Sequence, residues 1–527
     1  MPPSIVRRFY PRAYDNRLPI SHPEVRVNRA KFFKAALLNF VLLLLLFLCL
    51  FCYLFGALFQ EESRTHNLEI LWVDYDGGII GDAVRDAYKA LQSNGFPTLV
   101  ERPTSEYPSA SDLREAVCNT NYWAALYTFP RSSERLGLVI SGSDASQYNP
   151  SNILSYIWDE ARYPTVVDGL ISSNLHTLSD GARVAYIARN GTAAFSTIPA
   201  NNHAAIAAFT TPWTLSSINI QPTTQGTRAV YNTIVIVLVI IQDFFFLGAI
   251  NGLYASFEIY ARITPTRTIL VRDIISVTFT MVGSLLITCA IWAFKAHWNV
   301  SGTQFVLNWL TLWLFAHVNF LTLDVFTIWI PPQFVSMALI AWVAMNVTSI
   351  VFPFDLSSPF YRLGYALPAH AAYEVLTDIW SGGCNPHLQS ALPILFAYEL
   401  SGILWTGLGV YRRCHYAVIT EEAAQEAVRM RVEAALKLER EHDRRLGREN
   451  IDESVREDEN GESSRADENA GDFNRRTQRD KEAEEADRQQ AERELEELGG
   501  EIERMETRAT RMANFGPSFY LVGTERE

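Results

Sequence analysis

The stretch Leu37–Phe59, LLNFVLLLLLFLCLFCYLFGALF, decides the architecture of this 527-residue chain. It contains no charged residue, and a helix of about 20 apolar residues suffices to cross the hydrocarbon core of a bilayer. Because it is apolar on every side, it lacks the polar stripe of a surface helix. It is also longer than the apolar region of a signal peptide. The stretch therefore predicts a transmembrane helix.

The head that precedes this helix, residues 1–36, is basic. Two acidic residues, Asp15 and Glu24, stand against eight basic ones: Arg7, Arg8, Arg12, Arg17, Arg26, Arg29, Lys31 and Lys34. Positive charge beside a membrane segment stays in the cytoplasm. The head is therefore expected inside, and the residues after Phe59 are expected outside.

Five further apolar runs predict five more membrane helices. They cover residues 229–254, 273–294, 305–326, 334–352 and 391–411. Arg262, Arg267 and Arg272 lie in the loop between the first two of these runs, and Arg412 and Arg413 follow the last. An even number of helices puts both termini in the cytoplasm, and the basic loops agree with that orientation. The sequence predicts a polytopic α-helical membrane protein whose five-helix region is residues 229–411.

Residues 60–228 form a long polar stretch between helices one and two. Leu68–Val73 predicts a buried strand, Asp76-Gly77-Gly78 a tight turn, and the apolar spacing after Ile80 a helix. Strand, turn and helix in this order predict an α/β extracellular domain inserted between helices one and two. The further elements expected are strands at Trp123–Phe129 and Leu136–Ile140 and helices at Ile153–Asp159 and Asp168–Leu175.

Covalent modification is expected at four positions of the outer face. Asn190, in a loop-like context, and Asn299 begin glycosylation sequons. Cys118 and Cys384 are the two cysteines placed outside, where disulfides persist. They predict a bond that clips the ectodomain to the loop before helix six, with two unpaired thiols as the alternative.

That loop, Ser358–Leu388, alternates aromatic with small residues. Pro368 begins an expected short helix through Trp380. Because Tyr and Trp favour the headgroup region, a helix lying at the membrane interface fits, and an ordinary structured loop is the alternative.

The tail, residues 412–527, carries the acidity of the chain. It holds 21 Lys and Arg against 31 Asp and Glu, a net −10 of the total −13. Residues 421–446 are expected to extend helix six. Residues 447–473 have the composition of disorder, and residues 477–512 predict a solvated helix.

Motifs of known enzymes are nearly absent. Val73–Gly78 resembles the DxDG turn of haloacid-dehalogenase-type phosphatases, yet Gly78 stands where that family prefers Thr or Val. The structural alternative is a tight turn at Asp76-Gly77, with an Asp capping the next helix. There is no GxSxG, HExxH, P-loop or CxxC sequence and no zinc-type Cys/His cluster. We expect no enzyme, cofactor or metal, and the lack of a basic patch excludes nucleic acid.

Three ionisable residues, Asp243, His317 and Glu399, fall inside the apolar runs. A carboxylate in hydrocarbon must be paired, protonated or hydrated, and such groups mark transport pathways or proton relays. Their depths allow a shared polar pocket if their helices are neighbours. The alternative is interhelical hydrogen bonding that only holds the bundle together.

Three blocks carry a family resemblance that covers most of the chain. They are Val73, Asp74, Asp76, Gly77 and Gly78; then Tyr122, Trp123 and Ala124; then Gly364, Tyr365, Pro368 and Glu374. With one helix before the ectodomain and five after it, the chain resembles the fungal nitrosoguanidine-resistance membrane-protein family. That family is similar to phage-infection-protein-like permeases and, more distantly, to type-2 ABC exporter permeases.

The resemblance implies a plasma-membrane protein linked to drug resistance. We expect an exporter-like permease whose partners are membrane lipids and amphipathic small molecules, with a homo-oligomer or a separate ATPase subunit as further partners. The alternative is a non-transporting scaffold or regulator of lipid asymmetry that uses the ectodomain and tail as binding modules. Fixed acidic groups around a cavity would favour transport, and a dry, tightly packed bundle would favour the scaffold.

Overall fold

The computed structural model describes residues 22–23, 26–143, 148–199, 201–223, 234–459, 493 and 499–500. It is mostly helical, with a five-stranded sheet. The chain divides into two compact units. The first unit comprises the described residues up to Thr223 with Ile340–His370 and Ser381–Pro386, and the second comprises the rest.

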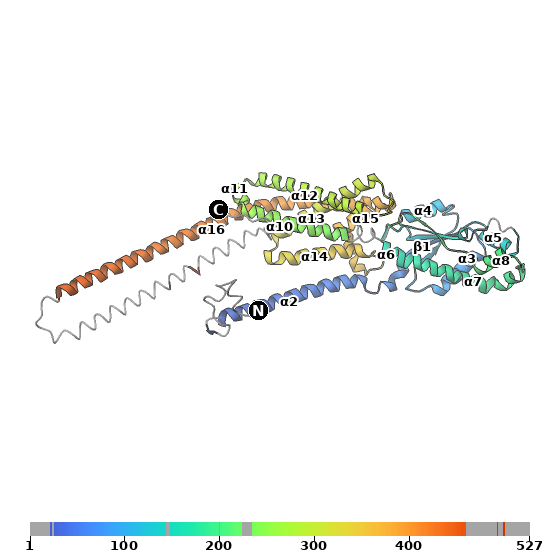
Figure 1. Cartoon of the computed structure of the whole chain (residues 1–527), viewed down its shortest axis with the longest axis horizontal. Helices are drawn as coiled ribbons and strands as arrows, with labels where there is room; N and C mark the ends of the chain where they lie inside the picture. Colours follow the sequence, from blue (N-terminus) through green and yellow to red (C-terminus); the bar gives the residue numbers. More distant parts are fainter. Residues whose placement is uncertain are drawn as a thin grey trace, which may run out of the picture. The chain divides into compact units, whose positions relative to one another are not determined.

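Six helices of the described residues are long and apolar enough to cross a membrane. They are α2 (Arg26–Leu58), α10 (Val235–Ser256), α12 (Pro265–Ala293), α13 (Gly302–Trp329), α14 (Pro332–Val351) and α16 (Leu388–Glu459). Figure 1 shows them as long coils, from blue α2 to orange α16. The six predicted apolar helices are confirmed, and the chain is a membrane protein by this criterion.

Several helices extend further than predicted. Pro265 opens α12 eight residues before the expected start at 273, because proline is preorganised for the first helical turn. At the other end of the chain, α16 runs without interruption to Glu459. The helix expected over 421–446 is confirmed as its continuation, whereas the disorder expected from 447 is wrong up to residue 459. Apart from residues 493, 499 and 500, the later tail predictions lie outside the described residues.

The residues between α2 and α10 build the predicted α/β region around a sheet of order β2-β1-β3-β4-β5. Its strands are β1 (Glu69–Asp74), β2 (Thr98–Glu101), β3 (Ala124–Thr128), β4 (Leu154–Trp158) and β5 (Ser216–Asn219). Strand β1 pairs in parallel with both β2 and β3, β4 runs antiparallel to β3, and β5 is parallel to β4. Its helices are α3 (Ile79–Leu91), α4 (Ala110–Cys118), α5 (Ser132–Ile140), α6 (Pro164–Val166), α7 (Ser173–Thr197) and α8 (His203–Thr210).

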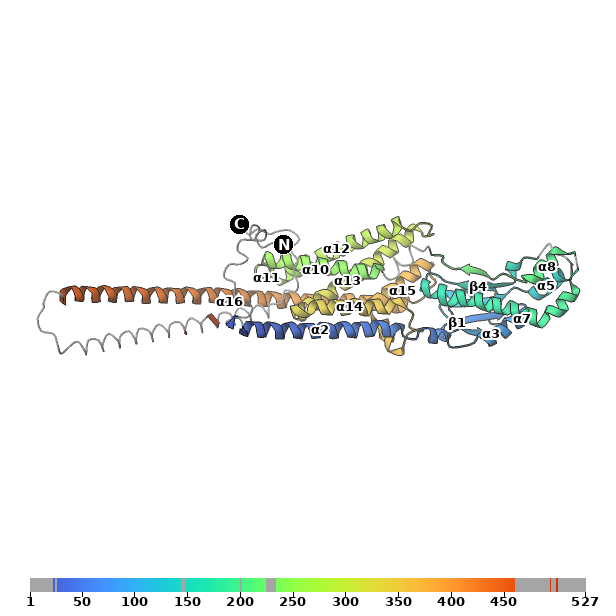
Figure 2. The same ribbon diagram turned by 60° about the horizontal axis from the view of Figure 1, so that its bottom comes forward.

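Strand β1 is buried on both faces, which explains its unbroken apolar sequence. Leu71 and Val73 form a core cluster with Leu113 and Val117 of α4. The alternate residue Trp72, also buried, points to the opposite face. Figure 2 shows α3 and α7, which pack against each other, running along the sheet.

Two predicted elements of this region have the wrong type. Leu136–Ile140 was expected as a strand but ends helix α5, where Leu136, Val139 and Ile140 are buried at helical spacing. Ile153–Asp159 was expected as a helix but contains β4, whose five residues are all buried. Short apolar runs that are buried on both faces show no alternation, so periodicity does not separate the two types.

The residues before the last membrane helix form two short helices. A short 3-10 helix, Pro359–Ala366, precedes α15 (Pro368–Ser381), so the predicted helix from Pro368 is confirmed. Asn346 of α14 accepts a hydrogen bond from the amide of Ala369 at 3.1 Å and so binds the first turn of α15. The ring of Tyr365 packs against Phe354 at 4.4 Å.

The second unit is a bundle in which α13 contacts α10, α12 and α16. Asn308 bonds Thr288 near one end of α12, and Asp324 bonds Arg272 near the other, so α12 and α13 are antiparallel. Helix α16 packs against α13 through Gly402, where an added Cβ would lie 2.8 Å from that of Leu321. A short helix, α11 (Ile259–Arg262), lies between α10 and α12 in sequence.

Candidate functional site

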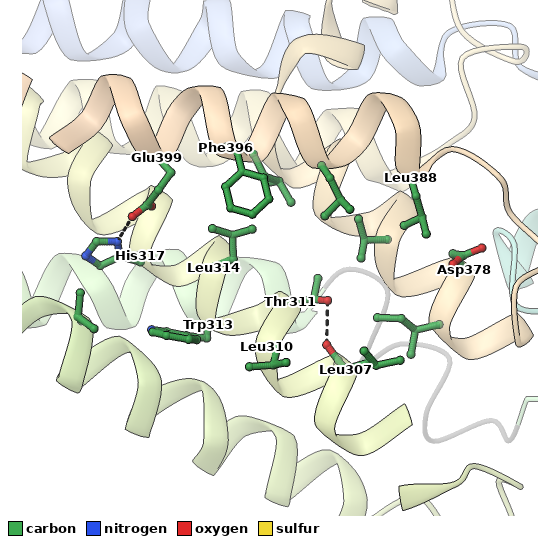
Figure 3. Close-up of a pocket in the computed structure, with 15 residues that line it drawn as sticks. Leu307, Leu310, Thr311, Trp313, Leu314, His317, Asp378, Leu388, Phe396 and Glu399 are labelled. Carbon is green, nitrogen blue, oxygen red and sulfur yellow. Dashed lines mark hydrogen bonds and ion pairs between the residues drawn. The ribbon is translucent and has the colours of Figure 1, made fainter. Parts of the chain in front are cut away.

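A cavity of about 520 Å³ lies in the second unit between α12, α13, α15 and α16. It is largely apolar because α13 presents Leu307, Leu310 and Leu314 on one helical face. The other lining residues are Val277, Thr311, Trp313, His317, Val375, Asp378, Ile379, Leu388, Leu392, Leu395, Phe396 and Glu399. In Figure 3, His317 and Glu399 lie at one end and Asp378 lies at the other. An apolar chamber with a few polar groups suits an amphipathic ligand.

The polar end of this cavity is a hydrogen-bonded His–Glu pair between two helices. Nδ1 of His317 lies 2.6 Å from Oε1 of Glu399, and the side chains are 8% and 16% exposed. Nε2 of His317 lies 3.2 Å from Oγ of Ser276, so hydrogen bonds join α16, α13 and α12. Oε2 of Glu399 is buried without a hydrogen-bond partner among the described residues. The pair places an imidazole and a carboxylate beside the apolar chamber.

Asp243, the third polar residue singled out in the sequence, lies elsewhere on α10. It is 1% exposed and does not line the cavity. Its Oδ2 is buried with no partner within the described part of the chain. The neighbouring Gln242 lies against Gly283 of α12. The structure thus brings His317 and Glu399 together and leaves Asp243 apart from them.

A second buried polar group joins α12, α13 and α16 near the ends of α10 and α13. Arg272 donates to both carboxylate oxygens of Asp324, at 2.7 and 3.0 Å. Arg413 donates to Oδ1 of the same carboxylate at 3.1 Å. The side chains of Arg272, Asp324 and Arg413 are 3%, 0% and 0% exposed. These three residues are called the ionic cluster below.

The ionic cluster contradicts the sequence prediction, which places Arg272 in a loop and Arg413 beyond the last helix. Both assignments are wrong because α12 begins before its apolar run and α16 continues after its own. One signal was available: Asp324 interrupts the apolar run LTLDVFTIW. A carboxylate inside the membrane requires a partner. The arginines near the ends of the neighbouring helices are the cations that could pair with it.

In the α/β region, Asp74 of the DxDG-like turn holds the turn together. Its Oδ1 accepts hydrogen bonds from Thr128 Oγ1 at 2.7 Å and from the amides of Asp76 and Gly77 at 3.1 and 3.0 Å. Its Oδ2 pairs with Arg85 at 2.9 Å, and the side chain is 5% exposed. The Asp74 carboxylate is therefore buried and both of its oxygens are engaged.

The other half of the turn differs from the prediction. Gly77 has φ +62°, as the tight turn requires. No side chain caps α3, whose N-cap is Gly78. Asp76 instead accepts a hydrogen bond from the amide of Ser133 at 2.9 Å, in the first turn of α5. The Ser133 hydroxyl in turn accepts from the amide of Ile80, so the motif joins two helix starts to the end of β1.

The expected modification sites have different surroundings. Asn190 lies inside helix α7 rather than in a loop, and its Nδ2 is buried, so its expected context is wrong. Asn299 is exposed and lies outside the helices. Cys118 and Cys384 are joined by a disulfide within the first unit. Glycosylation at either asparagine stays a prediction, and the structure favours Asn299 as the accessible one.

Asp159, directly after β4, provides a pH-dependent test of the α/β region. The residue is 4% exposed. Burial raises the pKa of its carboxyl from 3.8 to about 6, opposed by the amide of Ala161 and by Arg162 and Arg114 and reinforced by Glu160.

Because the folded pKa is raised, Asp159 binds its proton more tightly in the folded state. Its contribution to stability is therefore greatest below pH 4, falls as the pH rises to 6, and stays low above that. We expect Asp159→Asn to abolish this fall, which amounts to at most about 3 kcal/mol. Hydrogen exchange of the β4 amides in the full-length protein between pH 4 and 7 measures it. Equal pH dependence in the wild type and the variant would contradict the assignment.

The fold and the cavity define a class: a polytopic membrane protein with six apolar helices and a small α/β region. Residues 39–404 match the family described as protein of unknown function (DUF3533), and the chain belongs to this family. The match runs from α2 into α16. It includes the α/β region, His317, Glu399 and Asp324, and it ends before Arg413 and the acidic tail.

One relative is an uncharacterised endoplasmic reticulum membrane protein of Saccharomyces cerevisiae, YJR015W. It is 22% identical over 389 residues, which cover 66% of this chain and 74% of the relative. No solved structure matches the chain. The two matches support a family of fungal membrane proteins.

Proposed function

We propose that this protein is a permease that exports lipids or amphipathic small molecules and so contributes to resistance to xenobiotic compounds. The observation that carries the proposal is the apolar cavity with the His317–Glu399 pair at one end. An amphipathic molecule would place its apolar part against the leucines of α13 and its polar part near the unpaired Oε2 of Glu399. The resemblance to nitrosoguanidine-resistance proteins agrees with this function.

The packing beyond the pair supports a path that is closed at one end. Past Glu399, α16 packs against α13 at Gly402, and again at Gly409, where an added Cβ would overlap Ile328. The ionic cluster then joins α12, α13 and α16. In alternating access, one side of the binding site is sealed while the other is open. The glycine contacts and the ionic cluster would form the sealed side.

The energy source follows from the chemistry of the pair. A His and a Glu that share a hydrogen bond inside the membrane are typical of proton relays. We therefore propose coupling to a proton gradient and no enzymatic activity in this chain. A homo-oligomer or a separate ATPase subunit is the other arrangement that would supply energy.

We propose that both termini lie in the cytoplasm, as the basic head indicates. The α/β region would then face the lumen of the endoplasmic reticulum or the cell exterior, where the Cys118–Cys384 disulfide persists. The name of the yeast relative favours the endoplasmic reticulum membrane over the plasma membrane.

Transport can be measured in vesicles that contain only the full-length protein. We expect a fluorescent amphipathic compound to cross faster when a pH gradient is imposed. Glu399→Gln should lower this flux by about tenfold or more, because a hydrogen bond to a charged group is worth roughly 1.5–3 kcal/mol.

Two matched variants control for general damage. Glu422→Gln changes an exposed residue of the same helix, and Asp243→Asn changes a buried carboxylate outside the cavity. Both should keep the wild-type flux. Absence of flux in the wild type, with and without a gradient, would favour the non-transporting scaffold. Normal flux in Glu399→Gln would show that the pair only holds the helices together.

A further inference from the structure

The contact between His317 and Glu399 requires a proton. Nδ1 of His317 and Oε1 of Glu399 are 2.6 Å apart, and two lone pairs repel each other at this distance, so a proton lies between them. The Ser276 hydroxyl donates to the carbonyl of Asp273 at 2.9 Å, so it accepts from Nε2 of His317 at 3.2 Å. The imidazole is therefore protonated at Nε2, and Nδ1 shares a further proton with the carboxylate.

This shared proton sets the charge of the pair. With the proton the pair is neutral, whichever of the two residues carries it. Without the proton the pair has one negative charge, and the facing lone pairs would drive the Glu399 carboxylate away from His317. Among the described residues, Oε2 of Glu399 has no hydrogen-bond partner that would oppose this movement. Because Glu399 lines the cavity, loss of the proton would leave a negative charge at its polar end.

The charged groups around the pair do not compensate this negative charge. On α12, Asp273 interacts electrostatically with both members of the pair and with Arg272 and Asp324 of the ionic cluster. The ionic cluster has one more positive than negative charge, and Asp273, when ionised, balances that excess. On α15, Asp378 at the other end of the cavity is acidic as well. An unpaired buried charge is strongly unfavourable, so the deprotonated pair needs a positive charge from a ligand.

The cavity beside the pair suits an organic cation. Its volume of about 520 Å³ is that of a site for a drug-sized molecule. None of the described residues that line it is Lys or Arg, and its ionisable groups are His317, Asp378 and Glu399. Trp313 and Phe396 line it one helical turn from the members of the pair, and aromatic rings attract cations. In Figure 3 both rings lie toward the end of the cavity that contains the pair.

We propose that the cavity binds a lipophilic monovalent cation, such as a quaternary ammonium or phosphonium ion, in exchange for the proton of the His317–Glu399 pair. This inference rests on the proposed function, because it names the substrate class of the same cavity. The cation places its charge near the Glu399 carboxylate and its apolar groups against the leucines of α13. The proton passes to water as the cation enters. Proton and cation compensate the same negative charge, so each excludes the other.

The test measures ligand binding and proton release with the full-length protein in a neutral detergent, without a gradient. The probes are tetraphenylphosphonium and tetraphenylborate, which have similar shapes and opposite charges. We expect the cation to bind at least about tenfold more tightly than the anion. Each bound cation should release about one proton into a weakly buffered solution, and its affinity should rise with pH. Equal affinity for both ions, or cation binding without proton release, would overturn the proposal.

Three variants test whether the exchange occurs at the pair. Glu399→Gln keeps the size of the side chain but cannot ionise, so it should abolish proton release and weaken cation binding by about tenfold or more. Phe396→Leu removes an aromatic ring but no charge, so it should weaken cation binding severalfold and keep the proton release. Asp243→Asn changes a buried carboxylate that does not line the cavity and should match the wild type. Wild-type proton release by Glu399→Gln would overturn the proposal.

Failure of this inference and failure of the proposed function give different results. Cation binding with proton release, but no flux in vesicles, would support the cation site and contradict transport. Proton-coupled flux of a neutral amphipathic compound, with no preference for tetraphenylphosphonium over tetraphenylborate, would support transport and overturn the cation site. The proton count of the wild type needs no variant, so it decides the matter even where Glu399→Gln fails to fold.

Discussion

Replacing Asp324 with alanine is expected to destabilise the helical bundle by about 3–5 kcal/mol, because two buried guanidinium groups then share no carboxylate. The effect should appear as unfolding at a lower fraction of dodecyl sulfate in mixed micelles. Thr327→Val removes two side-chain hydrogen bonds, the one to the same carboxylate and the one that Thr327 accepts from Arg413, and should lower the free energy of unfolding by about 2 kcal/mol.

A second pair of variants separates the charge from the packing. Arg413→Met leaves Arg272 and Asp324 as a one-to-one pair, so we expect it to be much less destabilising than Asp324→Ala. Adding Arg413→Met to Asp324→Ala should recover part of the loss, because one unpaired charge is removed. If Asp324→Ala unfolds like the wild type, the carboxylate does not hold the three helices together.

Replacing Asp74 with alanine is expected to destabilise the α/β region by about 2–4 kcal/mol, because three hydrogen-bond donors lose a charged acceptor. The change leaves Arg85 and Thr128 without their shared acceptor and frees two amides of the turn. Hydrogen exchange of the β1 and α5 amides in the full-length protein measures the loss. Gly81→Ala should act in the same direction, because its Cβ would overlap the Asp74 carboxylate.

The matched control is Asp82→Ala. Asp82 pairs with the same Arg85, but its side chain is 53% exposed. Exposed ion pairs contribute at most about 1 kcal/mol, so this variant should unfold nearly as the wild type does. Asp74→Ala with wild-type exchange rates and a lost hydrolytic activity would reverse the structural assignment and favour the phosphatase-like one.

The membrane helices could be predicted from the sequence because each apolar run is long enough to cross a bilayer without help from tertiary contacts. Their ends could not. Polar residues of the first turns, such as Thr268 and Arg272 in α12, continue the helix because they are buried against other helices. Hydropathy detects the apolar part of a helix but not its buried polar turns, so it places the ends of these helices too early or too late.

The α/β region shows the opposite limitation. Strand β1 was predictable because the following turn and helix mark its end, and Gly77 has the positive φ that the turn requires. The two segments whose type was predicted wrongly, Leu136–Ile140 and Ile153–Asp159, are not followed by such a turn and helix. Ile153–Asp159 contains a strand because it pairs with β3, and Leu136–Ile140 is helical because its apolar face is buried. Both contacts involve residues distant in sequence.

The candidate site was partly predictable. His317 and Glu399 stand out as ionisable residues in apolar runs, although their contact depends on how α13 and α16 pack. Asp243 stands out equally and lies apart from them. The ionic cluster depends on arginines that hydropathy assigns to loops, so its members could be recognised only once the three helices were placed together.

The length of α16 has a mechanical consequence. This helix has 72 residues and contains Pro393, which follows the cavity-lining Leu392. Figure 1 shows it as one continuous coil. At about 1.5 Å per residue it measures about 108 Å, of which roughly 69 Å lies beyond Arg413. A tilt of about 5° at Arg413 would displace Glu459 by about 6 Å. The helix is a lever with its short arm along the cavity. A load on the distal end would therefore exert a torque on the contact between Gly402 and Leu321.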